Sequence, residues 1–342
     1  MDTKNLKKTA QQMVANGKGI IAADESAGTC QKRFDSVGVP CTEDNRRAYR
    51  ETIIAAPGLE QYVSGIILFD ETIRQESTEG ERFSDILAKK GILPGIKVDM
   101  GAKEFALHPG EKVTEGLDKL RERLAEYKTF GAAFAKWRAV ITIGESIPTD
   151  ACIHANAHAM ARYAALCQEA DIVPIVEPEV LIDGDHTIES CYEASVAALK
   201  KTFEELAGQD IALEGTILKA SMVIAGKKAA KQSSVEEVAS ETLRCLKESL
   251  PPALAGVVFL SGGQSDEQAT AHLNAMNKMG KHPWPLSFSY ARAIQSPVLK
   301  IWAENPNANV EKAREALLFR SRMNALATEG KYSEEMEKDR PY

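Results

Sequence analysis

One lysine of the sequence stands where its charge would be costly. Lys219 is the only ionisable residue of the apolar segment 216–223, TILKASMV. Such segments are usually strands buried on both faces, and a buried lysine is unfavourable unless its charge is paired or removed. A neutral amine is a nucleophile, so Lys219 indicates Schiff-base chemistry with a carbonyl substrate. The alternative is a lysine at a strand end whose amine reaches water, and this residue alone leaves both interpretations open.

Polar residues also stand at the ends of the other apolar segments. They are Asp24, Asp70, Lys97, Asp99, Lys136, Arg138, Glu177, Glu179, Ser261, Ser289 and Arg292. Side chains alternate along a strand, so Lys136 and Arg138 share one face, as do Glu177 and Glu179. A structural ion pair would explain any single member. The whole set is typical of an active site at one end of a sheet.

The elements that must position these residues alternate along the chain. Eight segments have the pattern of short strands: 19–24, 63–70, 94–99, 133–140, 172–180, 216–223, 256–261 and 286–292. Helical spacing separates them, for example at Val196, Leu199 and Phe203. Ser234 followed by Glu237 has the pattern of a capping box at a helix start.

Eight βα units predict a single (β/α)8 TIM barrel with extra helices, because the chain of 342 residues exceeds the ~250 typical of that fold. We expect the barrel over residues 1–330, with a final helix after about 309. Residues 331–342 would form a charged, mobile tail that closes over the active site. A doubly wound open sheet is the competing architecture, but the first strand is followed by AADES and not by G-x-G-x-x-G.

Two groups of residues are suited to phosphate. The loop LSGGQS, 260–265, follows a predicted strand and precedes a helix, and Arg292 follows the next strand; barrels often bind phosphate there. The same letters resemble the signature loop of ABC-type ATPases, but the chain has no G-x-x-x-x-G-K-[ST] loop. The second group is Ser26, Thr29, Arg33 and Lys97, where the two hydroxyls would also fit helix capping.

Composition narrows the partners and the compartment. The net charge of −7 argues against nucleic acid or an anionic membrane as the main partner. Six cysteines without a C-x-x-C pair fit reduced thiols, and the polar amino terminus and lack of a long apolar run predict a cytoplasmic protein. His154 and His158 are spaced i, i+4, but without H-E-x-x-H order we expect neither a metal nor another cofactor.

Seven ordered motifs together resemble one family. They are AADES at 22–26, GIKVD at 95–99, FAKWR at 134–138, VEPE at 176–179, GTILK at 215–219, LSGGQS at 260–265 and SFSYAR at 287–292. They resemble class I fructose-bisphosphate aldolases over about residues 10–330, and Tyr342 matches the family's terminal tyrosine. The resemblance implies metal-independent, reversible cleavage of fructose 1,6-bisphosphate to dihydroxyacetone phosphate and glyceraldehyde 3-phosphate.

The resemblance also implies roles for individual residues. Lys219 would form the imine, Lys136 would favour its neutral form, and Glu177 would handle protons. The remaining catalytic matches are Asp24 beside the reacting carbons, Glu179 as a supporting carboxylate and Tyr342 as proton donor to the enamine. The substrate-binding matches are Ser261, Gly262 and Arg292 for one phosphate, Ser26, Thr29, Arg33 and Lys97 for the other, and Arg138. The family usually forms homotetramers.

Three positions depart from the family pattern. Ala291 replaces the glycine of S-Y-G-R, Ala220 and Ser221 replace Pro-Asn, and Met100 replaces a lysine. Two other functions compete with the aldolase interpretation. Twin phosphate sites argue against another Schiff-base barrel such as a transaldolase. The intact set of Lys219, Lys136, Glu177 and Asp24 argues against a barrel kept only as a binding or scaffold protein.

Overall fold

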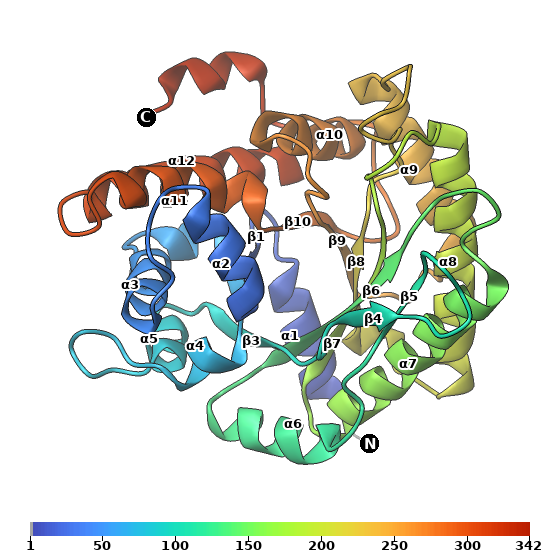
Figure 1. Ribbon diagram of the computed structural model, residues 1–342, viewed down its shortest axis with the longest axis horizontal. Helices are drawn as coiled ribbons and strands as arrows, with labels where there is room; N and C mark the ends of the chain where they lie inside the picture. Colours follow the sequence, from blue (N-terminus) through green and yellow to red (C-terminus); the bar gives the residue numbers. More distant parts are fainter. Residues whose placement is uncertain (1–2) are drawn as a thin grey trace.

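Eight parallel strands close into a barrel in the computed structural model, which describes residues 3–342 (Figure 1). The order of neighbours is β1, β10, β9, β8, β7, β6, β3, β2. Their bounds are β1 Gly19–Ala23, β2 Val63–Leu68, β3 Leu93–Lys97, β6 Phe134–Ile141, β7 Val173–Val180, β8 Ile217–Ala220, β9 Gly256–Phe259 and β10 Leu286–Tyr290. All eight predicted strands are present, and the (β/α)8 barrel is confirmed.

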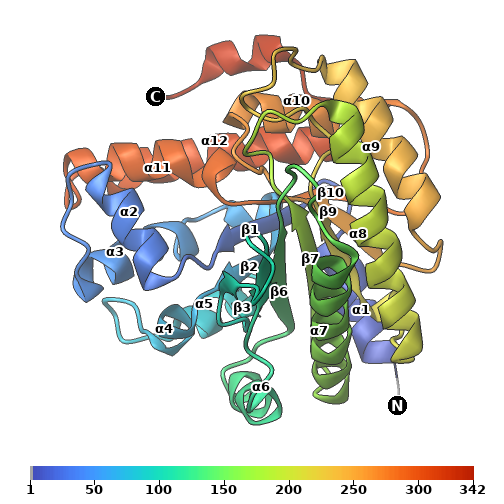
Figure 2. The same cartoon turned by 45° about the vertical axis from the view of Figure 1, so that its right-hand side comes forward.

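Helices surround the barrel and bury the outer faces of its strands (Figures 1 and 2). They are α1 Lys4–Met13, α2 Ala27–Asp35, α3 Glu43–Ile54, α4 Asp70–Arg74, α5 Phe83–Lys89, α6 Leu120–Thr129, α7 Asp150–Glu169, α8 Ile188–Gly208, α9 Val235–Ser249, α10 Asp266–Lys278, α11 Arg292–Glu304 and α12 Val310–Thr328. The predicted capping box is present at α9, where Ser234 accepts from the Glu237 amide at 3.1 Å. No helix among residues 3–342 is long and apolar enough to cross a membrane.

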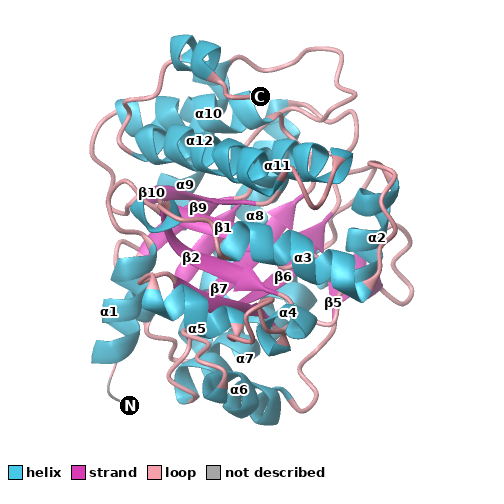
Figure 3. Cartoon of the chain, turned by 90° about the vertical axis from the view of Figure 1, so that its left-hand side faces the viewer, coloured by secondary structure: helices cyan, strands magenta, loops and turns pink. Residues whose placement is uncertain are grey.

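Helix α1 closes the amino-terminal end of the barrel. Its buried residues Leu6, Ala10 and Met13 belong to the apolar cluster that fills the barrel interior, together with Phe134 and other strand residues. Figure 3 shows α1 at one end of the strands and α2 and β5 at the other. Because one end is filled with apolar side chains, polar chemistry is restricted to the carboxyl-terminal end.

Glycines make room for aromatic rings inside the barrel and between the barrel and its helices. Inside the barrel, a methyl group added at Gly95 of β3 would overlap the Phe134 ring, which belongs to the neighbouring strand β6. In the apolar cluster shared with the helices, one at Gly19 of β1 would come 2.5 Å from the ring of Phe288 in β10. Interiors are packed to nearly crystalline density, so the missing side chains are part of the packing and not slack in it.

The strand ends differ from the prediction in one consistent way. The structure ends several strands earlier, so Asp24, Asp99 and Ser261 lie in the following loops, and Arg292 is the first residue of α11. Asp70 is a correction: it opens α4, pairs with Arg74 at 2.9 Å and faces away from the site. A strand can end as soon as its polar side chain has a hydrogen-bond partner in the following loop. The apolar pattern of the sequence does not show at which residue this happens.

Two short strands were not among those predicted from the sequence. β4 (Ala102–Glu104) and β5 (Lys112–Thr114) form a separate antiparallel hairpin at the mouth of the barrel. Both strands are three residues long and carry charged side chains, so neither has the apolar run by which strands are recognised.

The carboxyl-terminal segment packs on α10 and α12 (Figure 1). It contains a 3-10 helix, η3, over Glu334–Asp339. Arg320 of α12 is fully buried and pairs with Glu337 at 2.7 Å, and Arg340 pairs with Glu267 at 2.7 Å. A buried arginine requires carboxylate partners, and this segment supplies the nearest one in addition to Asp266 of α10, which lies 3.7 Å from Arg320.

The barrel floor generates a stability prediction. Gly95→Ala forces the Phe134 ring to move in a close-packed interior, so we expect a loss of about 2 kcal/mol in the free energy of unfolding. Gly208→Ala, at the end of α8 with no atom within 4 Å of the added methyl, should be neutral or stabilise by up to about 1 kcal/mol. Urea denaturation measures both, and equal effects would contradict this account of the floor.

Candidate active site

A cavity of about 800 Å³ opens at the carboxyl-terminal end of the barrel. Every predicted site residue except Tyr342 lines it: Asp24, Ser26, Thr29, Arg33, Lys97, Lys136, Arg138, Glu177, Glu179, Lys219, Ser261, Gly262 and Arg292. They come from the four strands β3, β6, β7 and β8, from the loops after β1 and β9, from α2 and from the start of α11. Residues far apart in the sequence therefore meet because parallel strands present their carboxyl ends on one side.

Four buried charged groups form the floor of this cavity. The Lys219 amine lies 3.1 Å from one oxygen of Glu177, and the Lys136 amine lies 3.4 Å from the other. Lys136 also contacts Asp24 at 2.6 Å. Lys219 is 4% exposed and Glu177 is 2% exposed, so these charges are neutralised by one another and not by water.

The cluster fixes the protonation of two of its members. Burial alone would raise the pKa of Asp24, but Lys136 and Lys219 outweigh it and hold that pKa well below its ordinary value. Burial alone would lower the pKa of Lys136, but the carboxylates of Asp24 and Glu177 outweigh it and raise the pKa instead. Asp24 is therefore an ionised carboxylate and Lys136 an ammonium group at neutral pH.

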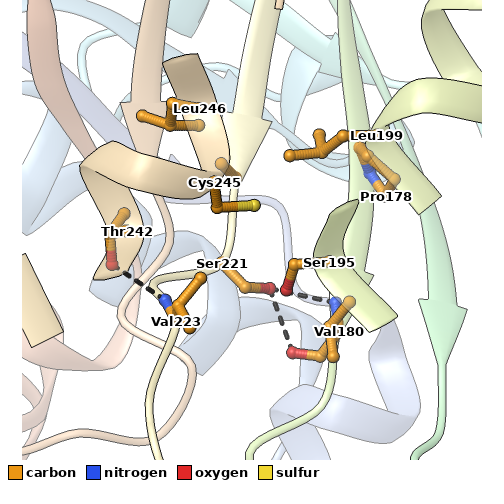
Figure 4. Close-up of a pocket in the computed structure, with 10 residues that line it drawn as sticks. Pro178, Val180, Ser195, Leu199, Ser221, Val223, Thr242, Cys245 and Leu246 are labelled. Carbon is orange, nitrogen blue, oxygen red and sulfur yellow. Dashed lines mark hydrogen bonds between the residues drawn. The ribbon is translucent and has the colours of Figure 1, made fainter. Parts of the chain in front are cut away.

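Strand register and one hydroxyl hold the cluster in place. Arg138 in β6 is paired with Glu177 in β7, whereas the ladder between β7 and β8 ends at Val176 and Leu218. Beyond that point Ser221 bridges the two strands: its hydroxyl accepts from the Val180 amide and donates to the Val180 carbonyl, both at 3.0 Å (Figure 4). Lys219 thus lies between two fixed points on the strand next to Glu177.

A second polar group lies beside the cluster. Asp99 is buried and accepts from the Lys97 amine at 2.7 Å and from the Arg138 amide at 3.3 Å. The Arg138 guanidinium pairs with Glu179. Asp99 and Glu179 orient two cations at the rim, which is the position-holding role expected of carboxylates next to a binding site.

The cavity wall after β9 and β10 is suited to an anion. The loop containing Ser261 and Gly262 lines it, and α11 begins there with Arg292. Arg292 makes no hydrogen bond or ion pair within residues 3–342, so its guanidinium is available to a ligand. The amide groups at the start of α11 add partial positive charge. The start of α10 does not contribute in the same way, because Ser265 and Gln268 cap it.

Ala291 does not occupy a position that only glycine can adopt. Its φ is −102°, outside the left-handed region, and its methyl group packs against the apolar cluster inside the barrel. The departure from the family's glycine therefore does not place a side chain at a positive φ.

The opposite wall holds the second group of predicted phosphate ligands. Ser26 precedes α2 but makes no capping hydrogen bond, and its hydroxyl lies 3.3 Å from that of Thr29. Arg33 pairs with Glu25, a carboxylate that also contacts the buried Arg50 at 2.8 Å. The hydroxyls and Arg33 thus face the cavity together, held from behind by Glu25.

Comparison with known proteins now decides the family. A family model described as class-I fructose-bisphosphate aldolase (glycolytic) matches residues 5–341. The chain is 59% identical to a probable fructose-bisphosphate aldolase class 1 of Xanthomonas campestris, covering 97% of this chain and 99% of that protein. It belongs to the class I fructose-bisphosphate aldolases.

More distant members agree in sequence and in fold. Fructose-bisphosphate aldolase 1 of Toxoplasma gondii is 50% identical over 96% of this chain and 91% of its own length. The Plasmodium falciparum aldolase, solved in complex with TRAP and a small-molecule inhibitor, superposes with a TM-score of 0.95 at 46% identity, covering 97% and 96% of the two chains. This aldolase family acts on phosphorylated sugars, so the chain is a carbon–carbon lyase with a sugar phosphate as substrate.

Tyr342 is the one predicted site residue that the structure places outside the cavity of this aldolase. Its ring packs edge-on against Phe319 of α12 and lies under Arg340. Its hydroxyl has no hydrogen-bond partner in the described part of the chain, and burial raises its pKa. The tyrosine is thus protonated, and in this position its hydroxyl is buried and does not line the cavity.

The histidine pair has a structural partner instead of a metal. His154 and His158 lie on α7 and each contacts a different oxygen of Glu205 on α8 at 3.0 Å. Within residues 3–342 no group of three or more His, Cys, Asp or Glu side chains is arranged to hold a metal ion.

Sequence reasoning missed the residues that hold the ligands in place. Glu25, which lies inside the AADES motif, was given no role, although it pairs with Arg33. Gln295, one helical turn after Arg292, donates to Glu25 at 3.0 Å and to the Ala22 carbonyl at 2.6 Å. Only the position of Gln295, i+3 from a predicted ligand on the same helix, offered a signal.

One buried histidine next to the phosphate loop generates a pH prediction. Nδ1 of His272 lies 2.6 Å from Oε1 of Gln264, and burial lowers the pKa of His272 from 6.5 to about 4. Between pH 6.5 and 4 the unfolded chain therefore binds a proton that the folded chain does not. Stability from this residue is full above pH 6.5 and falls as the pH drops, by at most about 3 kcal/mol. Urea denaturation at pH 5 and pH 7 should show a smaller pH dependence in His272→Gln, and an unchanged dependence would contradict the assignment.

Proposed function

We propose that this chain cleaves fructose 1,6-bisphosphate reversibly, through an imine on Lys219, to dihydroxyacetone phosphate and glyceraldehyde 3-phosphate. The observation that carries the proposal is the contact of 3.1 Å between the buried Lys219 amine and Glu177. A nucleophile and an acid/base within hydrogen-bond reach are what imine formation needs. The cavity around them has cationic groups on two walls, which matches a substrate with a phosphate at each end.

Imine formation uses the Lys219–Glu177 contact. Lys219 gives a proton to Glu177 across this contact, and the resulting neutral amine adds to the ketose carbonyl to form a carbinolamine. Glu177 then gives that proton to the departing hydroxyl, so that water leaves and a protonated imine remains. Glu177 is again a carboxylate at that point, and it pairs with the positive charge of the imine. The second oxygen of Glu177, 3.4 Å from Lys136, keeps the carboxyl group oriented throughout.

Carbon–carbon cleavage uses Asp24. Its carboxylate takes the proton of the hydroxyl next to the breaking bond, a carbonyl forms there, and the electron pair of the bond moves into the imine to give an enamine. Glyceraldehyde 3-phosphate leaves. Lys136 holds Asp24 ionised for this step through the 2.6 Å contact, and the low pKa of Asp24 has the same cause.

Release of the second product needs a proton on the enamine carbon, and we assign that proton to Tyr342. The tail 331–342 would then leave its contacts with Phe319 and Arg320, cover the cavity and return in each cycle. Water next hydrolyses the imine to dihydroxyacetone phosphate and free Lys219.

We also propose a cytoplasmic homotetramer. One relative, fructose-bisphosphate aldolase 4 of Arabidopsis thaliana, is named as cytosolic and is 49% identical over 92% of this chain. Light scattering of the purified protein measures the assembly, and a mass of one 37.3 kDa chain would refute it.

The imine is tested by trapping. Borohydride reduces an imine to a stable secondary amine, so treatment with dihydroxyacetone phosphate should leave a triose-phosphate adduct on the peptide containing Lys219, with or without EDTA. Lys219→Gln should trap nothing and lose cleavage activity by at least about 10³-fold, because no other nucleophile replaces the amine. Trapping on another lysine, or cleavage that EDTA abolishes, would rule out the Lys219 mechanism.

Tyr342 is tested by separating the chemical steps. Tyr342→Phe should slow cleavage turnover by about 10²-fold, the usual contribution of one proton donor, because the enamine waits for its proton. Imine trapping with the same ligand should be unaffected, because it precedes that step. Phe319→Leu, which changes only the resting contact of the ring, serves as the control and should slow turnover far less. An equal loss of trapping in Tyr342→Phe would contradict the assignment.

A further inference from the structure

Lys227 lies in the segment between β8 and α9, outside the predicted site, and its backbone is firmly placed. Its amide donates to the Ile182 carbonyl at 3.0 Å, and the Lys228 amide donates to the Gly184 carbonyl at 2.8 Å. A methyl at Gly226 would come 2.5 Å from the Gly184 carbonyl oxygen. The segment is therefore packed backbone to backbone against the loop after β7, which fixes the point from which the Lys227 side chain extends.

The side chain reaches over the phosphate loop. A Cβ atom built on Gly263 would lie 2.5 Å from the Lys227 amine and 3.2 Å from a terminal nitrogen of Arg292. Since both nitrogens lie within these distances of one point, they are at most 5.7 Å apart. A lysine and an arginine from different elements thus converge on the loop that carries Ser261 and Gly262.

Charge balance indicates what belongs between them. Arg292 has no carboxylate partner within residues 3–342, and Lys227 contacts only Asp183, at 3.2 Å. Asp183 is 70% exposed at its side chain, so this contact is weak and readily exchanged. Two cations this close repel each other unless an anion is shared between them, and a phosphate group has enough oxygens to contact both.

We propose that Lys227 is a further ligand of the phosphate held by Ser261, Gly262 and Arg292. Asp183 contacts the lysine at 3.2 Å, and the doubly charged phosphate replaces Asp183 when substrate binds. The flexible stem of lysine allows this exchange without backbone movement. The proposal rests on the proposed function, because it assumes that this wall binds a substrate phosphate.

The consequence is discrimination by the phosphate alone. Lys227 touches neither the carbonyl carbon nor Lys219, so it adds binding energy equally to substrate and transition state. Its loss should raise KM and leave kcat nearly unchanged. A ligand without the phosphate should not be affected.

The experiment compares four variants of the full-length protein. Lys227→Gln should raise KM for fructose 1,6-bisphosphate about tenfold with kcat within about twofold, and Lys227→Arg should restore most of the loss. Asp183→Asn removes the competing carboxylate and should lower KM about threefold. Lys228→Gln removes an exposed charge one residue away with no ion pair in the described chain, so its KM should match the wild type.

Borohydride trapping supplies the second measurement. With dihydroxyacetone phosphate the half-saturating concentration should rise about tenfold in Lys227→Gln, and with unphosphorylated dihydroxyacetone it should stay that of the wild type. Lys227→Gln and Lys228→Gln behaving alike, or equal effects on both ligands, would overturn the role of Lys227. Failure of the wild type to trap either ligand would instead overturn the proposed function. Circular dichroism checks folding, and Asp183→Asn, which changes an exposed side chain, remains decisive where Lys227→Gln does not fold.

Discussion

The structure depends on placing two lysines inside an apolar barrel without leaving a charge unbalanced. Lys136 and Lys219 are both nearly inaccessible to water, and the two carboxylates of Asp24 and Glu177 stand within 3.4 Å of them. Glu177 contacts both amines, so it is the carboxylate that links the charges of the two lysines. A proton or a bond added at one member must be compensated by another, which makes the group respond to chemistry as a unit.

The barrel keeps the charged cluster and the apolar packing that stabilises the fold at opposite ends. The amino-terminal end is filled by apolar residues of α1 and by the Phe134 ring set against Gly95. The carboxyl-terminal end receives the polar residues after each strand, with Ser221 continuing the contact between β7 and β8 where the ladder stops. Packing at one end thus holds the strands rigid enough for a charged cavity at the other.

The sequence predicted this division because both signals are local. Apolar runs identified all eight barrel strands, and the polar residues that follow them predicted most of the cavity lining. Partners that come from distant segments left no such signal: Gln295 for Glu25 and Asp183 for Lys227 are set by the tertiary fold. Asp70 was misjudged for the same reason, since a charged residue after a strand looks alike whether it turns inward or toward Arg74. Tyr342 was assigned by resemblance alone. No sequence pattern indicated its contact with Phe319 of α12.

The segment that carries Tyr342 also contributes to stability, because it pairs with the buried Arg320. Glu337 belongs to the same short segment as Tyr342, and it is the carboxylate closest to a guanidinium with no exposed surface. Proteolysis or an affinity tag that disturbs this segment would remove the ion pair with Glu337 and leave Asp266, 3.7 Å away, as the remaining carboxylate of Arg320, which lowers the free energy of unfolding. Proteolytic loss of this segment would therefore lower stability as well as turnover. Preparations that differ in their final residues would differ in both properties.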